Sequence, residues 1–332
     1  MGGAIIAANK IADIGEQMAA NDLDMQTQST LYSIDRAYWM VVSLRQKQKL
    51  ANSYRDLVQK LNEDVHKMIK QGVATKADGL KVDVKVNEAD MQIMQVEDGL
   101  TLSKMLLCQL CGIPMDQDIQ LADENKESLG MTGQFVDASV QQQAAADSAK
   151  STRPELKMLQ NTVELTQQSV KLVRAANLPH VALTGRYTIS NPNVFNGFQK
   201  RFTGVWNVGV LVQVPVWNWF DGAYKVRAAK AAANIAQMNL DDTQEKIHLQ
   251  ITQSQFKVKE AERKLNMAMK NIKSAEENLR CANLGFKEGV MEITDVMAAQ
   301  TAWQQAQSQK IDAEIDVKLT QVGLNKALGI LQ

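Results

Sequence analysis

The chain is poor in residues that interrupt helices and in residues that fill thick globular cores. Aromatic residues make up only 5% of it, which argues against a bulky core. It has five prolines among 332 residues, at positions 114, 154, 179, 192 and 215. None of them interrupts residues 7–110 or 220–332, so either stretch is free to form a very long helix.

The sequence also lacks an excess of charge, a long apolar run and the common catalytic motifs. Its 37 basic and 37 acidic residues cancel, so net charge does not steer it toward nucleic acid or an anionic surface. No stretch approaches the roughly 18 uninterrupted apolar residues of a transmembrane helix. A P-loop, a GxSxG elbow, an HExxH helix and a Rossmann fingerprint are all missing. An enzyme is therefore the least expected class of protein.

What the chain does contain is an internal repeat at an offset of about 217 residues. KQGVATKAD at 70–78 aligns with KEGVMEITD at 287–295. GGAIIAANKIA near residue 2 echoes FDGAYKVRAAKAA near residue 220, with a shift of a residue or two. At one fixed offset and without a gap, these residues match: Lys70 with Lys287, Gly72 with Gly289, Val73 with Val290, Asp78 with Asp295, Leu107 with Leu324, and Gly112 with Gly329. Each copy is expected to be a long helix, a glycine turn and a second long helix.

Apolar residues in the expected helices follow a coiled-coil pattern. Alternating spacings of four and three join Tyr54, Val58, Leu61, Val65 and Met68, and the same spacing runs from Val86 to Leu110. A helix over residues 7–70 would be about 95 Å long at 1.5 Å per residue. The economical structure is a pair of antiparallel hairpins that reverse near Gly72 and Gly289, namely 7–70 with 76–110 and 222–287 with 293–328.

The hydrophobic period changes from helix to strand after residue 180. In VALTGRYTIS (181–190) apolar and polar residues alternate, and residues 205–217 continue the alternation. The second segment has one unbroken apolar face, formed by Trp206, Val208, Val210, Val212, Val214 and Val216. Two strands of about ten residues with one apolar face match the span of an outer-membrane barrel strand. Trp217, Trp219 and Phe220 stand where an aromatic girdle belongs. A soluble sandwich hairpin with one buried face is the alternative.

The order of these segments resembles the TolC-type outer-membrane efflux protein family. The resemblance covers nearly the whole chain. The motifs that carry it are RPEL at 153–156, NLPHVALTGRY at 177–187, VPVWNWFDGA at 214–223, the two glycine turns, and the Leu–Gly closures at 110–112 and 328–329. It implies a mainly α fold with a small β part, in which two repeated long antiparallel helical hairpins accompany one β-hairpin of a trimeric outer-membrane barrel.

The family resemblance also divides the chain into five segments. They are a first helical-hairpin repeat at 1–112, an equatorial segment at 113–152, a connecting helix at 153–179, a β-hairpin at 180–219 and a second repeat at 220–332. The equatorial segment is polar and mixed, and we expect irregular structure with short helices there. The connecting helix begins at RPEL and is closed by Pro179.

The resemblance implies a homotrimer whose strands form a barrel in outer-membrane lipid and whose helices form a periplasmic tunnel. A periplasmic adaptor (a membrane fusion protein) and an inner-membrane pump would engage the tunnel. The implied function is passive conduction of pump-driven substrates across the periplasm and outer membrane, in a tripartite efflux or type I secretion system. No catalysis, cofactor, metal or nucleic acid is implied.

The resemblance assigns roles to the two turns and to one strand face. Asp78 and Asp295 are expected to line the periplasmic constriction, where a three-fold axis would form acidic rings that select cations. The alternative is that each acid only complements a helix N-terminus. Some relatives carry a basic residue where this chain has Met291, so a latch there would need other residues, such as Lys76 and Glu292. The expected adaptor-docking residues are Gly72, Val73, Thr75, Gly289, Val290 and Met291, and the expected lipid-facing residues are Trp206, Val208, Val210, Val212 and Val214.

The sequence departs from the family pattern at its start. By the internal symmetry, GGAIIAANKIA corresponds to residues that follow a strand pair. A signal peptide, a first short helix and a first strand pair are expected before it, and the opening residues have the features of none of them. Three protomers with two strands each give six strands, fewer than the eight of the smallest barrels. We therefore expect an N-terminally truncated form, either a fragment or a gene with a late start.

Two other classes of protein stay open on the residues alone. A periplasmic adaptor would carry one hairpin and lipoyl-like half-motifs, and a structural coiled-coil protein would leave the alternation at 205–216 unexplained. Cys108 and Cys111 form a CxxC, but no second CxxC or nearby His completes a metal site. Their spacing of three places both on one helix face, which predicts two small core residues.

Overall fold

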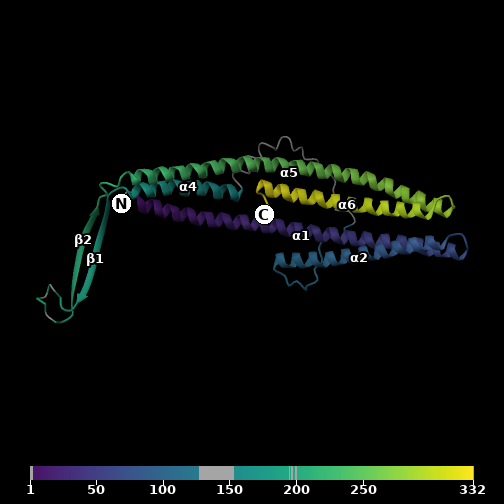
Figure 1. Cartoon of the computed structure of the whole chain (residues 1–332), viewed down its shortest axis with the longest axis horizontal. Helices are drawn as coiled ribbons and strands as arrows, with labels where there is room; N and C mark the ends of the chain where they lie inside the picture. Colours follow the sequence, from purple (N-terminus) through teal and green to yellow (C-terminus); the bar gives the residue numbers. More distant parts are fainter. Residues whose placement is uncertain (1–2, 127–152, 194, 196, 199, 332) are drawn as a thin grey trace. The chain divides into compact units, whose positions relative to one another are not determined.

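The computed structural model describes residues 3–126, 153–193, 195, 197–198 and 200–331. Its elements in chain order are α1 (Ala4–Lys70), α2 (Lys76–Cys111), α4 (Pro154–Ala175), β1 (His180–Ser190), β2 (Thr203–Gln213), α5 (Asp221–Lys287) and α6 (Ile293–Leu328) (Figure 1). The chain divides into two compact units, one of Met1–Met25 with Arg153–Lys246 and one of Gln26–Thr152 with Ile247–Gln332. Much of the predicted equatorial segment, residues 127–152, lies outside the described residues.

The helices reproduce the internal repeat. Both α1 and α5 have 67 residues, both α2 and α6 have 36, and each pair begins and ends 217 positions apart. The predicted helices 7–70, 76–110, 222–287 and 293–328 are confirmed to within three residues. Throughout the described part of the chain, no helix combines the length and the apolar character that a membrane crossing requires.

Each long helix ends at a glycine in the left-handed conformation. At the end of α1, Gly72 has a φ of 75°, and the N–H of Val73 donates to the carbonyl of Met68 at 2.9 Å. At the end of α5, the N–H of Val290 donates to the carbonyl of Gly285 at 2.8 Å. Both bonds are characteristic of the Schellman turn, in which the glycine adopts a left-handed conformation that would strain other residues. The two copies of the sequence repeat thus end their long helices with the same turn geometry.

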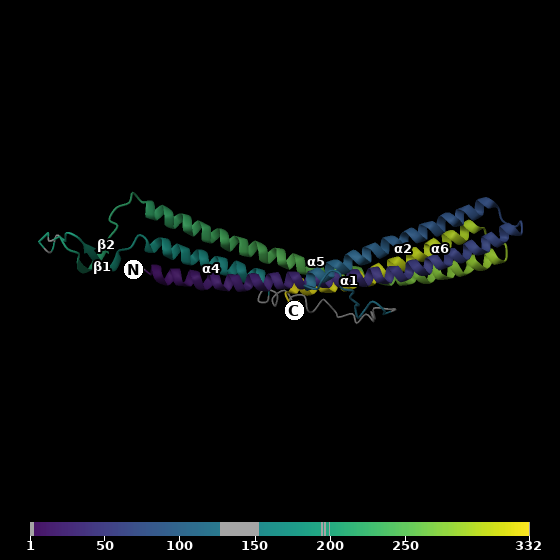
Figure 2. The same ribbon diagram turned by 90° about the horizontal axis from the view of Figure 1, so that it is seen from below.

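The core of the second unit is layered along its helices. Near the two turns, residues of α1, α2, α5 and α6 form one apolar cluster, which we call the tip cluster: Tyr54, Val58, Leu61, Val65, Val82, Ala89, Leu279, Ala282, Ile293, Val296 and Ala299. Farther from the turns, each hairpin has a core of its own, with Ala37, Val41, Leu100 and Leu107 between α1 and α2, and Ala261, Leu265, Ala268, Ala313 and Val317 between α5 and α6. The two turns therefore lie at the same end of this unit (Figures 1 and 2).

The described part of the equatorial segment is anchored to α1. The hydroxyl of Tyr38 donates to Asp123 Oδ2 at 2.6 Å, and Lys49 Nζ donates to the carbonyl of Glu124 at 3.0 Å. Burial, together with the hydrogen bond to Asp123, raises the pKa of Tyr38 to about 12. The Tyr38 hydroxyl therefore stays a neutral donor at any physiological pH.

In the first unit, α4 lies beside the first turns of both α1 and α5 (Figures 1 and 2). Its buried residues Leu156, Val163 and Val170 recur every seven positions, which makes one apolar seam along the helix. Pro154 occupies the first turn, where its missing N–H costs no helical bond. The helix places the start of β1 at the same end as the start of α5.

The two strands form an antiparallel hairpin of eleven pairs, from His180 opposite Gln213 to Ser190 opposite Thr203. The prediction that the second strand extends to residue 216 was wrong, because β2 ends at Gln213. Val214, predicted to lie in the lipid-facing strand, therefore follows the strand. Pro215 cannot donate to a strand ladder, and Pro179 limits the partner strand in the same way, so the prolines close the hairpin at its base.

Candidate functional site

The two glycine turns form a matched pair of exposed tips, residues 72–75 and 289–292. Their most exposed apolar residues are Val73, at 69% of its full accessibility, and Val290, at 79%. These two side chains hold equivalent positions directly after the turn glycines. A water-exposed valine at each of two matched positions is a small apolar surface that none of the described residues covers.

Asp78 forms a capping box at the start of α2. Its backbone N–H donates to Thr75 Oγ1 at 3.3 Å, and Asp78 Oδ2 accepts from the N–H of Thr75 at 3.2 Å. The same oxygen accepts from the Thr75 hydroxyl at 2.6 Å, and Asp78 Oδ1 pairs with Lys81 Nζ at 3.2 Å. The carboxylate therefore has local partners for both oxygens and caps the helix, whatever else it faces.

The hydrogen bonds from the side chain and backbone of Thr75, followed by that from Lys81, hold the pKa of Asp78 below its usual range. We expect Thr75→Val to raise this pKa more than Lys81→Gln does, because valine lacks the Thr75 hydroxyl, whose hydrogen bond is the largest contribution. A carboxyl-carbon NMR titration would measure both shifts. The ionised box contributes its full stability above the unfolded pKa of about 3.9 and loses it as pH falls through the lower folded value. A larger shift in Lys81→Gln would contradict this ranking.

The second tip is not a copy of the first at this position. Glu292 stands where the first tip has Thr75, and it makes no side-chain capping bond to α6. Asp295 is exposed, and no hydrogen bond or ion pair to its carboxylate occurs among the residues that the structure describes. Asp78 and Asp295 thus align in sequence, but among the described residues only Asp78 has a cation, Lys81, paired with its carboxylate.

Met291 and Glu292 contact residues close to them in the sequence. A Cβ added at Gly285 would lie 2.8 Å from Met291 Cγ, so the methionine side chain folds back over α5. The hydroxyl of Thr294 donates to Glu292 Oε2 at 3.2 Å. Among the described residues Lys76 makes no ion pair with Glu292, so a latch between these two residues stays a prediction.

The β-hairpin has one nearly continuous apolar face. Leu183 pairs with Val210, Val181 with Val212, and Tyr187 with Trp206, so the alternating residues of both strands share a side. All of these side chains are exposed or half-exposed. The Tyr187 ring also lies across Gly204, where an added Cβ would overlap its hydroxyl. The alternation predicted for residues 206–212 is present in β2, and nothing in the described chain covers this face. That the face meets lipid stays a prediction.

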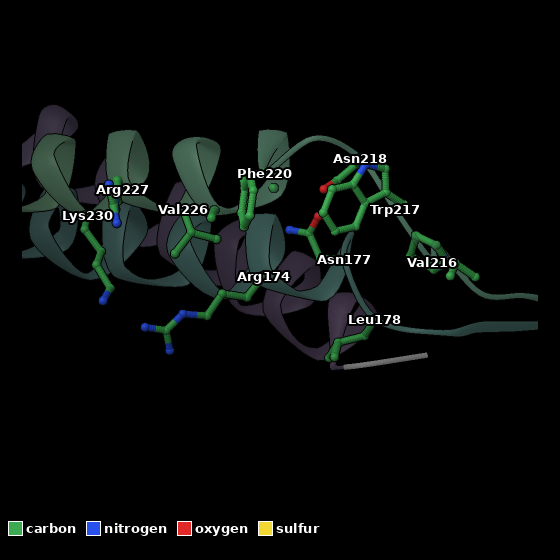
Figure 3. A pocket seen from close by; sticks show the side chains of 13 residues that line it. Arg174, Asn177, Leu178, Val216, Trp217, Asn218, Phe220, Val226, Arg227 and Lys230 are labelled. Carbon is green, nitrogen blue, oxygen red and sulfur yellow. The ribbon is translucent and has the colours of Figure 1, made fainter.

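A hollow of about 710 Å³ lies at the base of this hairpin, between the end of α4, the segment that follows β2 and the start of α5 (Figure 3). Its lining combines three cations, Arg174, Arg227 and Lys230, with apolar side chains that include Val216, Trp217 and Phe220. We refer to it as the base pocket. Sequence reasoning missed it, because α4 and α5 bring the cations together across some fifty residues of chain.

The two cysteines of the CxxC differ in burial. Cys108 is buried and Cys111 is exposed, so the prediction of two core residues is confirmed only for Cys108. Cys111 is the last residue of α2 and precedes the Gly112 turn, where the packed seam ends. In the described segments, no group of three or more His, Cys, Asp or Glu side chains is placed to hold a metal ion.

Comparisons with solved structures show the same fold. The chain superposes on the outer-membrane channel OprN with a TM-score of 0.84 at 16% identity, covering 98% of this chain and 72% of that one. It matches the outer membrane protein VceC from Vibrio cholerae with a TM-score of 0.82 at 16% identity, covering 99% and 76%. For the CmeC outer membrane channel of Campylobacter jejuni the values are 0.80, 14%, 98% and 68%. No curated protein is significantly similar in sequence.

The sequence itself carries a family signature. The model of the outer membrane efflux protein family matches residues 145–330, which are more than half of the chain and include the β-hairpin and both helices of the second repeat. The first repeat, outside this match, has the same helix lengths and turns as the second. The chain therefore belongs to the outer membrane efflux protein family and is a channel protein of the outer membrane, extending into the periplasm, rather than an enzyme.

Proposed function

We propose that the chain assembles as a homotrimer and passively conducts substrates delivered by an inner-membrane pump, as the outer-membrane component of a tripartite efflux or type I secretion system. A periplasmic adaptor would dock on the paired tips. The strand hairpin would contribute to a barrel in outer-membrane lipid. Family membership argues against the adaptor and the purely structural coiled coil as alternatives.

The observation that carries this proposal is the uncovered apolar face of the β-hairpin. Eleven strand pairs present Leu183, Tyr187, Val208 and Val210 on one side, and no element of the described chain packs on them. A hairpin of two strands is only marginally stable in water. An exposed apolar sheet face of this length is stabilised in lipid, where alternate residues of barrel strands face hydrocarbon.

The paired tips support the other half of the proposal. The tip cluster joins both repeats, so residues 72–75 and 289–292 are presented together from one packed end of the second unit. Exposed Val73 and Val290 offer matched apolar contacts for helical tips of an adaptor. Asp78 and Asp295 follow at the start of each returning helix, where three-fold symmetry would repeat each acid around the axis.

The two acids should differ in their effect on ion selectivity. We expect Asp295→Asn to lower the cation preference of the channel more than Asp78→Asn does, because Lys81 lies 3.2 Å from Asp78 and offsets its charge. The double variant should lower it further and leave trimer assembly unchanged. Reversal potentials of single channels of the intact protein, recorded in a salt gradient, measure this preference.

Two controls make the selectivity experiment decisive. Glu288→Gln removes an acid from the residue that follows the end of α5, rather than from a returning helix, and should leave the preference near that of the parent protein. A preference that stays unchanged in the Asp78→Asn, Asp295→Asn double variant would remove both residues from the constriction. A larger effect of Asp78→Asn alone would contradict the neutralisation by Lys81.

A further inference from the structure

The base pocket has an amphiphilic lining that the channel function does not use. We propose that it binds an acidic glycerophospholipid, with the phosphate of the headgroup on Arg174, Arg227 and Lys230 and an acyl chain along Val216 and Trp217. This inference rests on the proposed function, in which the β-hairpin lies in outer-membrane lipid. The pocket then lies at the helical end of the hairpin, where the chain leaves the membrane.

The cationic side of the pocket draws residues from two helices. Figure 3 shows Arg174 extending from α4 and Lys230 extending from α5 toward the same side of the hollow. The Arg227 guanidinium lies 5.7 Å from the centre of the Tyr224 ring. In the described parts of the chain none of these three cations has a carboxylate within ion-pair distance. They therefore form a local positive patch on a chain whose net charge is zero.

The patch continues beside the pocket. Arg174 also lines an adjoining hollow between α1 and α4, together with Lys10 and Lys171. The nearest acid in the first turn of α5, Asp221, is already paired with Lys225 at 2.7 Å. Several cations thus gather around the end of α4, and among the described residues no carboxylate lies within ion-pair distance of Lys10, Lys171 or Arg174. Such basic pockets at a membrane surface attract anionic headgroups.

The apolar side of the pocket is held in a defined geometry. The Trp217 ring lies edge-on to Phe220 at 5.5 Å and to Trp219 at 6.0 Å. Trp219 and Phe220 have φ values of 51° and 63°, a conformation that bulky residues adopt only when the surroundings enforce it. The strained turn places the indole and phenyl rings against the hollow. Tryptophan at this position suits the boundary between headgroups and acyl chains.

The cationic side and the apolar side of the base pocket together favour one class of ligand. A free inorganic anion would use the cations but leave the apolar wall in water, and an uncharged lipid would leave the cations unbalanced. A glycerophospholipid with net negative charge satisfies both, because one molecule carries the phosphate and the acyl chains. Arginine also suits this role, since its guanidinium binds two phosphate oxygens at once.

Fluorescence quenching tests the site in the full 332-residue chain. In a single-tryptophan variant that keeps Trp217, we expect half-maximal quenching at a concentration of brominated phosphatidylglycerol at least tenfold lower than of brominated phosphatidylcholine, in micelles of nonionic detergent. The R174Q/R227Q/K230Q variant should abolish this difference. A matched control, K259Q/K270Q/K273Q, removes the same charge from exposed positions elsewhere on α5 and should keep it.

A second reporter separates this inference from the proposed function. In a variant that keeps only Trp206, on the apolar face of β2, both brominated lipids should quench alike. If Trp206 is quenched but Trp217 does not distinguish the two lipids, the headgroup site is wrong and the membrane hairpin stands. If neither reporter is quenched, both proposals fail. Displacement of phosphatidylglycerol by an equal concentration of inorganic phosphate would instead indicate a site for free phosphate and overturn the lipid assignment.

Discussion

Val208→Lys is expected to destabilise membrane assembly by about 2–4 kcal/mol, the cost of a lysine on the lipid face of a barrel strand near the bilayer midplane. Val208 pairs with Gly185 at the middle of the eleven-pair hairpin and exposes 64% of its surface. No side chain of the described chain is placed to neutralise a lysine on this face. Urea titration of the intact protein folded into phospholipid vesicles gives the free energy of unfolding.

Thr184→Lys provides the matched control. Thr184 stands next to Gly185 at nearly the same depth, but on the opposite face of the hairpin, where its hydroxyl donates to the carbonyl of Gly209 at 3.2 Å. The same charge there should cost about 1 kcal/mol, the value of one lost hydrogen bond. Equal losses in the two variants would contradict the assignment of the Val208 face to lipid.

Much of this fold is predictable from sequence because its determinants are local. The glycines at 72 and 289 end their helices through one residue's backbone conformation, and prolines are absent from the stretches that precede them. The seam from Tyr54 to Val65 is buried as its heptad spacing predicts. Because the two repeats are offset by 217 residues, each helix boundary in one repeat predicts the corresponding boundary in the other.

The structure departs from the sequence pattern where a single residue overrides it. Valine alternation continues through Val214 and Val216, but Pro215 ends the ladder before them. Asp78 and Asp295 align perfectly, yet the Thr-to-Glu difference at the preceding cap gives them different partners. The T-x-x-D spacing of a capping box was the signal that could have separated them.

The base pocket was beyond sequence analysis for a different reason. Arg227 and Lys230 sit three positions apart on one helix face, which reads as an ordinary solvated stripe. Only the packing of α4 against the start of α5 adds Arg174, and only the strained turn after β2 adds the aromatic wall. Such sites depend on contacts between segments whose register no local pattern specifies.

Leu61→Ala should destabilise the second unit by about 2–5 kcal/mol, the usual cost of a leucine truncation in a packed core. Leu61 is 6% exposed and belongs to the tip cluster, to which both helical hairpins contribute. The cavity would weaken the contact that presents the two tips together. Chemical denaturation of the chain in detergent, at concentrations where it is monomeric, measures the loss.

Leu80→Ala is the matched control, because it makes the same substitution in a helix close to the same turn. Leu80 is 56% exposed on α2, so its truncation removes little buried surface and should cost less than about 0.5 kcal/mol. Hydrogen exchange near Gly72 and Gly289 should accelerate together in Leu61→Ala, since one cluster supports both turns. Faster exchange at one turn alone would show that the repeats are stabilised separately, and docking of an adaptor could then not rely on a single rigid pair of tips.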